Sequence, residues 1–260
     1  MSEQTRKFKD FTSVTSVQSS DYIVLMNSSG KAEKVSLATL KSALGVVTYD
    51  TVIDGVFVAT HRTSDNYPVL YRPVDWPAQQ SAGQVATGVL VCDGDKQLLI
   101  APTESASKLY WGSVSGEGGG YKTGDYLAAK TDYAGKTNTA KILASNSYKN
   151  DGDTYAPGFC NAYSRMNANN QGLPAGSWWL PSLGELWLML ANFNKINYAL
   201  SKITGATLLQ RDAYWSSTES SANSAWYLNL GGGVQGSGGS KTGGQFWVRP
   251  VSAFQKALTL

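Results

Sequence analysis

The sequence predicts an α+β fold in which an antiparallel sheet is flanked by helices. Two observations carry this prediction. Residues 52–59 and 88–92 are rich in apolar and β-branched side chains, as strands are, whereas 182–193 has the apolar period of a helix. Strand-like segments then return near the carboxyl end, at 213–215, 226–230 and 246–254. Strands at both ends with helices between them allow the two ends to pair in one sheet.

Residues 1–45 are expected to form a small first module. A strand at 21–26 leads through a turn at 27–30 to a second strand at 34–35, and a helix begins after Ser36. A hairpin and one helix are too small to bury their own apolar face. This module is therefore predicted to serve attachment or oligomerisation.

Residues 46–85 are expected to be a connector that includes a small β-unit at 52–59. Three prolines, Pro68, Pro73 and Pro77, are expected to interrupt regular structure in the rest of this range, because proline removes a backbone donor.

The remaining range, 86–260, is expected to be the main domain. Strands at 88–92 and 97–101 are joined by an Asp-Gly turn, which is typical of a β-hairpin. Ser182 and Glu185 match the S-x-x-E capping box at the start of the clearest helix. Further helices are predicted at 137–145, 157–166 and 194–203, and a glycine-rich loop at 116–120.

The composition limits the classes of function. The 260 residues include 16% charged and 11% aromatic residues, and the formal net charge is +3. Because no Lys/Arg stripe is present, nucleic acid is not an expected partner. No apolar run is long enough for a membrane helix, and the first residues contain no apolar signal region, so we expect no membrane insertion and no secretory signal. Low charge with many Tyr, Trp, Gly and Ser is typical of recognition surfaces.

No group of residues indicates a catalytic site, a cofactor or a metal. His61, the single histidine, has no paired nucleophile and is expected to be structural. Asp151 and Asp153 have the spacing of calcium ligands, but a solvated turn is favoured. Cys92 and Cys160 leave open one disulfide or two buried thiols, of which the thiols are favoured. An enzyme would need convergent titratable groups, and the sequence displays none.

The most informative segment is the glycine-rich tract at 231–244. Eight of its fourteen residues are glycine, and Lys241 is the one formal charge between residues 220 and 247. Glycine and serine cannot fill a core, whereas the tryptophans on both sides of the tract bury well. The pattern predicts an aromatic frame that holds an exposed, replaceable surface. Residues 231–236 also satisfy G-x-G-x-x-G, but no helix comes after them, so a dinucleotide site is rejected.

Four motifs succeed one another in the order and spacing of a C-type-lectin-like domain. They are WWLPSLGEL at 178–186, YWSSTE at 214–219, AW at 225–226 and VRPVSAF at 248–254. The range 86–254 therefore resembles the variable proteins of diversity-generating retroelements, whose domain is related to formylglycine-generating enzymes. Of the adjacent Trp178 and Trp179, one is expected to face inward and the other to line the edge of the variable surface. Residues 1–45 are similar to the N-terminal part of phage tail-fibre proteins.

The resemblance implies a variable region at about 214–254 that displays a ligand-binding surface. In that family, mutagenesis changes adenines, mostly in Asn codons, near the end of the gene. The candidate ligand-binding residues are Tyr227, Asn229, Gly231, Gly232, Gly236, Ser237, Gly238, Gly239, Ser240, Thr242, Gly243, Gly244 and Phe246. The expected scaffold of this site is Trp215, Trp226, Trp247 and Arg249, since tryptophan cannot arise from an Asn codon by adenine changes alone.

The resemblance implies host recognition by a phage tail-fibre tip. The partner would be a bacterial surface receptor, either protein or glycan, and the location a virion tail assembled in the host cytoplasm. A homotrimer is expected, with the N-terminal module attached to other tail proteins. The alternative is a bacterial cell-surface adhesin or fimbrial tip with the same domain, and the missing signal peptide favours the phage.

Overall fold

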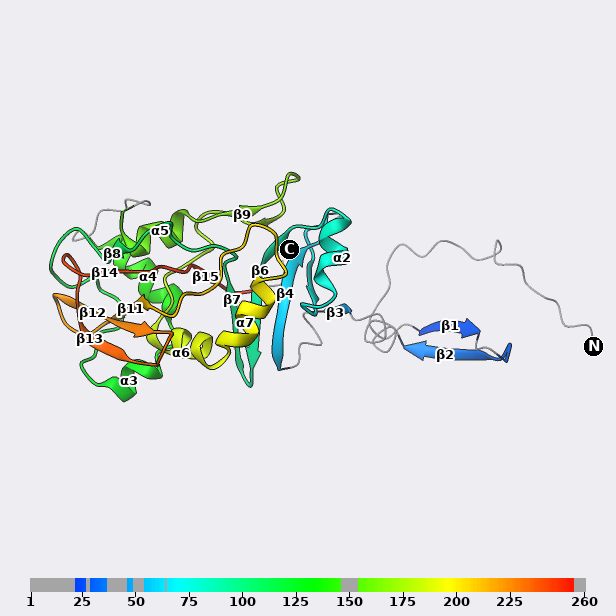
Figure 1. Cartoon of the computed structure of the whole chain (residues 1–260), viewed down its shortest axis with the longest axis horizontal. Coiled ribbons are helices and arrows are strands. Elements are labelled where there is room, and N and C mark those ends of the chain that lie inside the picture. The colour runs from blue at the N-terminus through cyan, green and yellow to red at the C-terminus, as the bar shows by residue number, and fades with distance from the viewer. Residues whose placement is uncertain are drawn as a thin grey trace, which may run out of the picture. The chain divides into compact units, whose positions relative to one another are not determined.

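The computed structural model describes residues 22–26, 29–36, 46–48, 54–63, 65–145 and 154–254. The chain divides into two compact units, Met1–Val46 and Val47–Leu260. In the first unit, β1 (Tyr22–Met26) and β2 (Ala32–Ser36) pair antiparallel, as the sequence predicts (Figure 1). The helix expected after Ser36 and the candidate calcium ligands Asp151 and Asp153 lie outside the described residues.

The second unit contains a six-stranded sheet. Its strand order is β15-β7-β6-β4-β5-β3. The strands are β3 (Val46–Thr48), β4 (Gly55–His61), β5 (Pro68–Tyr71), β6 (Ala86–Asp93), β7 (Lys96–Ile100) and β15 (Val251–Ser252). Because β15 pairs with β7, strands from both ends of this unit share one sheet, as predicted. The predicted β6–β7 hairpin is confirmed, and Gly94 in its turn has a φ of 58°, which favours glycine.

The range 46–85 is not a connector in the structure. It supplies β4, which lies between β5 and β6 and is largely buried, together with helix α2 (Trp76–Ser81). Two of the prolines that were expected to interrupt regular structure instead lie at the start of a strand and of a helix. Pro68 is the first residue of β5, and Pro77 lies in the first turn of α2, where its missing N–H costs nothing.

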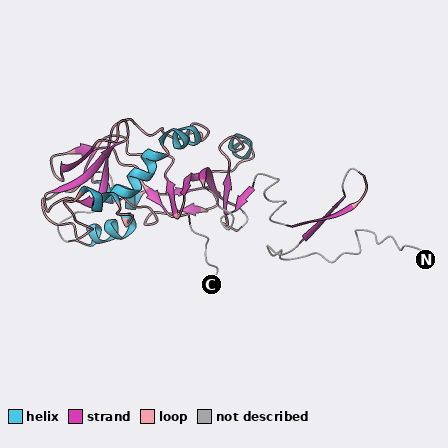
Figure 2. Ribbon diagram, turned by 90° about the horizontal axis from the view of Figure 1, so that it is seen from below, coloured by secondary structure: helices cyan, strands magenta, loops and turns pink. Residues whose placement is uncertain are grey.

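Two helices join this sheet to a second, smaller one (Figure 2). They are α6 (Leu183–Ala191) and α7 (Phe193–Leu200). The capping box predicted for α6 is present, since Ser182 accepts from Glu185 N and Glu185 accepts from Ser182 N. Helix α6 contacts β11 (Ala213–Glu219) and β12 (Ser224–Asn229) of the smaller sheet, and α7 contacts β4 and β6. The two helices therefore place both sheets on one apolar core.

Three shorter helices complete the helical part. They are α3 (Tyr126–Lys130), α4 (Gly135–Ala144) and α5 (Ala156–Ala162). Helix α5 ends earlier than the predicted 157–166, because Tyr163 is extended and the chain enters β9 (Arg165–Met166), which pairs with β10 (Gly172–Leu173). Helix α3 was not predicted, and its signal is the N-cap Asp125, which accepts from Leu127 N.

The second sheet has the order β11-β12-β13. Its strands are β11 (Ala213–Glu219), β12 (Ser224–Asn229) and β13 (Gln235–Ser240). A short pair, β14 (Gln245–Phe246) with β8 (Leu109–Tyr110), lies beside it. The strand β13 was not predicted, because its glycines disfavour extended structure on their own. It forms on β12 and leaves the glycine-rich tract at the edge of the sheet (Figure 1).

Candidate functional site

The glycine-rich tract lies directly on aromatic rings. Tyr227 of β12 is paired with Gly236 of β13, and a Cβ added at Gly236 would lie 2.2 Å from Tyr227 Cζ. At Gly239 an added Cβ would lie 2.5 Å from Trp215 Cζ3 and 2.9 Å from Ala225 O. Glycine is therefore needed at Gly239, where the backbone oxygen cannot move aside, whereas a side chain at Gly236 would have to displace the end of the Tyr227 ring.

The rings beneath the tract form a continuous cluster. Phe246 lies with its centroid 4.4 Å from that of Trp215 and 4.4 Å from that of Tyr227. Trp215 is fully buried, and its Nε1 donates to Leu109 O at 2.8 Å. Tyr227 and Phe246 are half-buried, so these two rings present apolar edges beside the polar surface of β13.

Exposure divides the candidate ligand-binding residues into three groups. Gly239 is buried, in disagreement with the expectation that it contacts ligand. Five are half-buried, namely Tyr227, Asn229, Gly236, Gly244 and Phe246. The exposed ones form what we call the glycine-rich face: Gly231, Gly232, Ser237, Gly238, Ser240, Thr242 and Gly243. At Gly232 and Gly238 nothing lies within 4 Å of an added Cβ, so larger side chains fit there.

A buried ion pair holds the end of the glycine-rich face. Lys241 Nζ lies 2.5 Å from Glu219 Oε2, and both side chains are almost fully buried, at 0% and 1% exposed. The same ammonium donates to Gly116 O at 2.7 Å and to Ala222 O at 2.9 Å. Burial lowers the pKa of Lys241, and the hydrogen bond to Glu219 opposes that effect.

The carboxylate of Glu219 also binds the backbone of the loop at 116–120, which is distant in the sequence. It accepts from Gly118 N at 2.7 Å and from Gly120 N at 2.9 Å. The loop predicted at 116–120 is thus held by backbone donors on a buried anion. Sequence reasoning gave Lys241 no role, although a single charge in an otherwise uncharged tract was the available signal.

The four expected scaffold residues are wholly or partly buried. Trp215, Trp226 and Arg249 are buried, and Trp247 is half-buried. Arg249 donates to Glu104 Oε2 at 2.9 Å and to the carbonyls of Ala101 and Thr207 at 3.0 Å each.

The expectation for the adjacent tryptophans Trp178 and Trp179 is wrong. Both are buried, so neither is exposed at an edge. Trp178 donates to Leu173 O and packs on Tyr163, while Trp179 donates to Glu185, and none of these partners belongs to the glycine-rich face.

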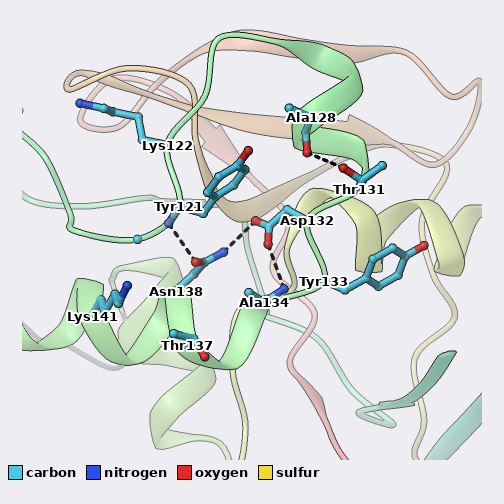
Figure 3. A pocket seen from close by; sticks show the side chains of 11 residues that line it. Tyr121, Lys122, Ala128, Thr131, Asp132, Tyr133, Ala134, Thr137, Asn138 and Lys141 are labelled. Atoms are coloured by element: carbon cyan, nitrogen blue, oxygen red, sulfur yellow. Dashed lines mark hydrogen bonds between the residues drawn. The ribbon is translucent and has the colours of Figure 1, made fainter. Parts of the chain in front are cut away.

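A separate pocket of about 580 Å³ lies between α4, the turn before it and the 120–122 loop (Figure 3). Its floor is formed by Asp132 and Asn138, which hydrogen-bond to each other at 2.8 Å. None of its lining residues belongs to the glycine-rich face.

The titratable groups singled out from the sequence have structural surroundings. Burial lowers the pKa of His61 to about 4, and its Nδ1 lies 2.7 Å from Thr87 Oγ1. Cys92 and Cys160 are free and buried, and burial raises the pKa of Cys92 to about 12. Within the described ranges, no three His, Cys, Asp or Glu side chains are grouped so that they could hold a metal ion.

Comparisons with known proteins do not assign this chain to a family. No family model matches the chain, and no curated protein matches its sequence. A solved fimbrial protein from Bacteroides ovatus ATCC 8483 is similar over 92% of this chain, with 17% identity and a TM-score of 0.43. The match covers 49% of that protein, so the chain spans about half its length. Across the described part of the chain, every helix is too short or too polar to cross a membrane.

Proposed function

We propose that this protein binds a macromolecular partner through the glycine-rich face. The observation that carries the proposal is the contrast between the face and its frame. Gly232 and Gly238 open into free space, while Gly239 packs on Trp215 and Lys241 is paired inside the molecule. Side chains at the open positions can therefore change without disturbing buried contacts, as a recognition surface requires.

The half-buried aromatic rings give this face its own binding chemistry. Tyr227 and Phe246 lie next to the small polar residues of β13 and supply apolar area at low conformational cost. Rings of this kind are frequent energetic centres of protein interfaces. A partner, protein or glycan, would contact the rings at the edge and the serine and threonine hydroxyls across the strand.

We also propose that the domain is C-type-lectin-like and belongs to a diversity-generating retroelement. Support comes from the order of the motifs in the sequence, two of which lie in strands: YWSSTE makes up most of β11, and VRPV leads from Val248 into β15. In this proposal the protein is a trimeric phage tail-fibre tip that recognises a bacterial surface receptor. Trimerisation would add avidity to weak single contacts.

The bacterial adhesin or fimbrial tip is the alternative, and it would use the same face. A reverse transcriptase gene beside a near-copy of the 3′ end of this gene would favour the retroelement. Variation spread evenly over sibling sequences, and not concentrated at about 214–254, would contradict it. The mass of the protein in solution tests the trimer.

The binding proposal is tested with labelled protein on a panel of bacterial strains. We expect Gly232→Asn and Gly238→Asn to change which strains are bound while the melting temperature stays the same. Val74→Asn is the matched control, because Val74 is 62% exposed and lies on the α2 side of the second unit. The proposal fails if the face variants bind as the parent does, or if the control alters binding equally.

A further inference from the structure

The pocket beside α4 is built to donate hydrogen bonds. Its outer lining includes Lys122, Lys141 and the tyrosines Tyr121 and Tyr133, which are 42% and 41% exposed. The ammonium of Lys122 points away from the floor of the pocket (Figure 3). A lysine side chain only donates, and a phenol donates readily. The hydroxyl of Thr131 is at the rim and donates to Ala128 O at 3.0 Å, which leaves its oxygen to accept.

The acceptors on the floor are already used. Asp132 accepts from Ala134 N at 2.9 Å through Oδ1, and from Asn138 Nδ2 at 2.8 Å and Thr218 Oγ1 at 2.7 Å through Oδ2. Asn138 Oδ1 accepts from Tyr121 N at 2.9 Å. These bonds fix the floor and leave the buried carboxylate, 7% exposed, little capacity for a cation.

Groups of both signs surround the pocket. Lys141 is exposed, and Lys122 forms an ion pair with Glu117. Opposing charge comes from Glu117 and from the buried Asp132. The exposed ammonium of Lys141, beside the phenols of the lining, favours a ligand that carries an oxyanion.

Tyr121 adds a flat apolar surface to this lining. Figure 3 shows its ring above the Asp132–Asn138 pair, with Lys141 rising from α4 at the side. One face of a pyranose ring consists of C–H groups, which pack on the electron-rich face of a phenol. The cavity of about 580 Å³ falls within the usual range for small-ligand sites and exceeds what a bare inorganic anion would fill.

We infer that this pocket binds an acidic saccharide unit, with the sugar ring on Tyr121 and the carboxylate on Lys141. The inference stands apart from the proposed function of the glycine-rich face, because the two surfaces share no residue. A glycan partner could then be held at two places on one domain.

The test is a titration of the whole chain with D-glucuronate, monitored by NMR shifts or calorimetry. We expect saturation in the millimolar range, with methyl glucoside and inorganic sulfate each bound about tenfold more weakly. Lys141→Met and Tyr121→Ala should each weaken glucuronate binding by about tenfold, and Tyr121→Phe should retain it. Lys202→Met is the control, because Lys202 lies over the Tyr198 ring outside this pocket and its loss should change nothing.

Three results would overturn the inference. The first is that glucuronate binding does not saturate. The second is that methyl glucoside binds as tightly as glucuronate. The third is that inorganic sulfate binds as tightly as glucuronate while Tyr121→Ala leaves glucuronate binding unchanged. The last result would indicate an anion site without a sugar platform. None of these results bears on strain binding by the glycine-rich face, so failure of one proposal is distinguishable from failure of the other.

Discussion

The ring of Tyr227 covers Gly236 across the β12–β13 pair so closely that a Cβ at residue 236 would lie 2.2 Å from Tyr227 Cζ. A glycine opposite an aromatic residue lets the ring lie on the backbone of the neighbouring strand, which compensates for the low strand propensity of glycine. Gly239 also packs on a ring, that of Trp215, although Trp215 lies on β11 and the partner of Gly239 on β12 is Ala225. The glycine-rich tract is thus a strand shaped by the rings under it.

Gly239→Ala should destabilise the protein by about 1–3 kcal/mol, the usual cost of overpacking. The new Cβ would meet both the buried Trp215 ring and Ala225 O, and the backbone oxygen cannot move aside independently. Gly238→Ala, one residue away with nothing within 4 Å, should stay within about 0.5 kcal/mol of the parent. Urea unfolding measures both, and equal stabilities of the two variants would contradict the close packing described for Gly239.

Lys241→Met should destabilise by about 3–5 kcal/mol, because it leaves the Glu219 carboxylate buried without its cation. Adding Glu219→Gln to this variant should recover part of the loss, and a double-mutant cycle measures the coupling between the two side chains. Lys195→Met, an exposed lysine on α7, is the control and should be nearly neutral. Simple additivity of the two substitutions would rule out the coupling.

Glu185 should make the protein less stable as pH rises. Burial raises its pKa from 4.5 to about 7, with a smaller contribution from nearby Asp132. Between these pH values the folded state holds a proton that the unfolded state has released, so its stabilising contribution is complete below pH 4.5 and is lost through pH 7. The slope for one proton is about 1.4 kcal/mol per pH unit. Glu185→Gln keeps the capping box and should remove this slope in unfolding titrations at successive pH values.

His61 should have the opposite effect. Its pKa is lowered from 6.5 to about 4 by burial, so the unfolded state binds a proton that the folded state does not. Its contribution is complete above pH 6.5 and is lost as pH falls toward 4. In the parent protein the two slopes partly cancel between pH 4.5 and 6.5. We therefore expect His61→Gln alone to make stability fall more steeply with rising pH, and an unchanged profile would refute the assignment.

Local patterns in the sequence predicted the elements whose determinants lie within a few residues. The β6–β7 hairpin is specified by a two-residue turn, and α6 by a cap and an acidic residue three positions later. The α+β class is given by the order of such elements. The expectation for Pro68 and Pro77 was wrong because proline can either end or begin a strand or helix. Which of the two it does depends on how the neighbouring residues pack and pair.

The candidate surface was located by composition, but its internal division was decided by the tertiary structure. Gly238 and Gly239 are chemically identical in the sequence, and only the position of the Trp215 ring makes one replaceable and the other essential. Lys241 meets Glu219 from 22 residues away, and Glu219 meets Gly118 from 101 residues away. Contacts at such separations depend on how strands and loops are brought together, which no local propensity encodes. The sequence by itself thus determined which segments are aromatic and apolar and which are small and polar, while packing determined which of the small residues are exposed.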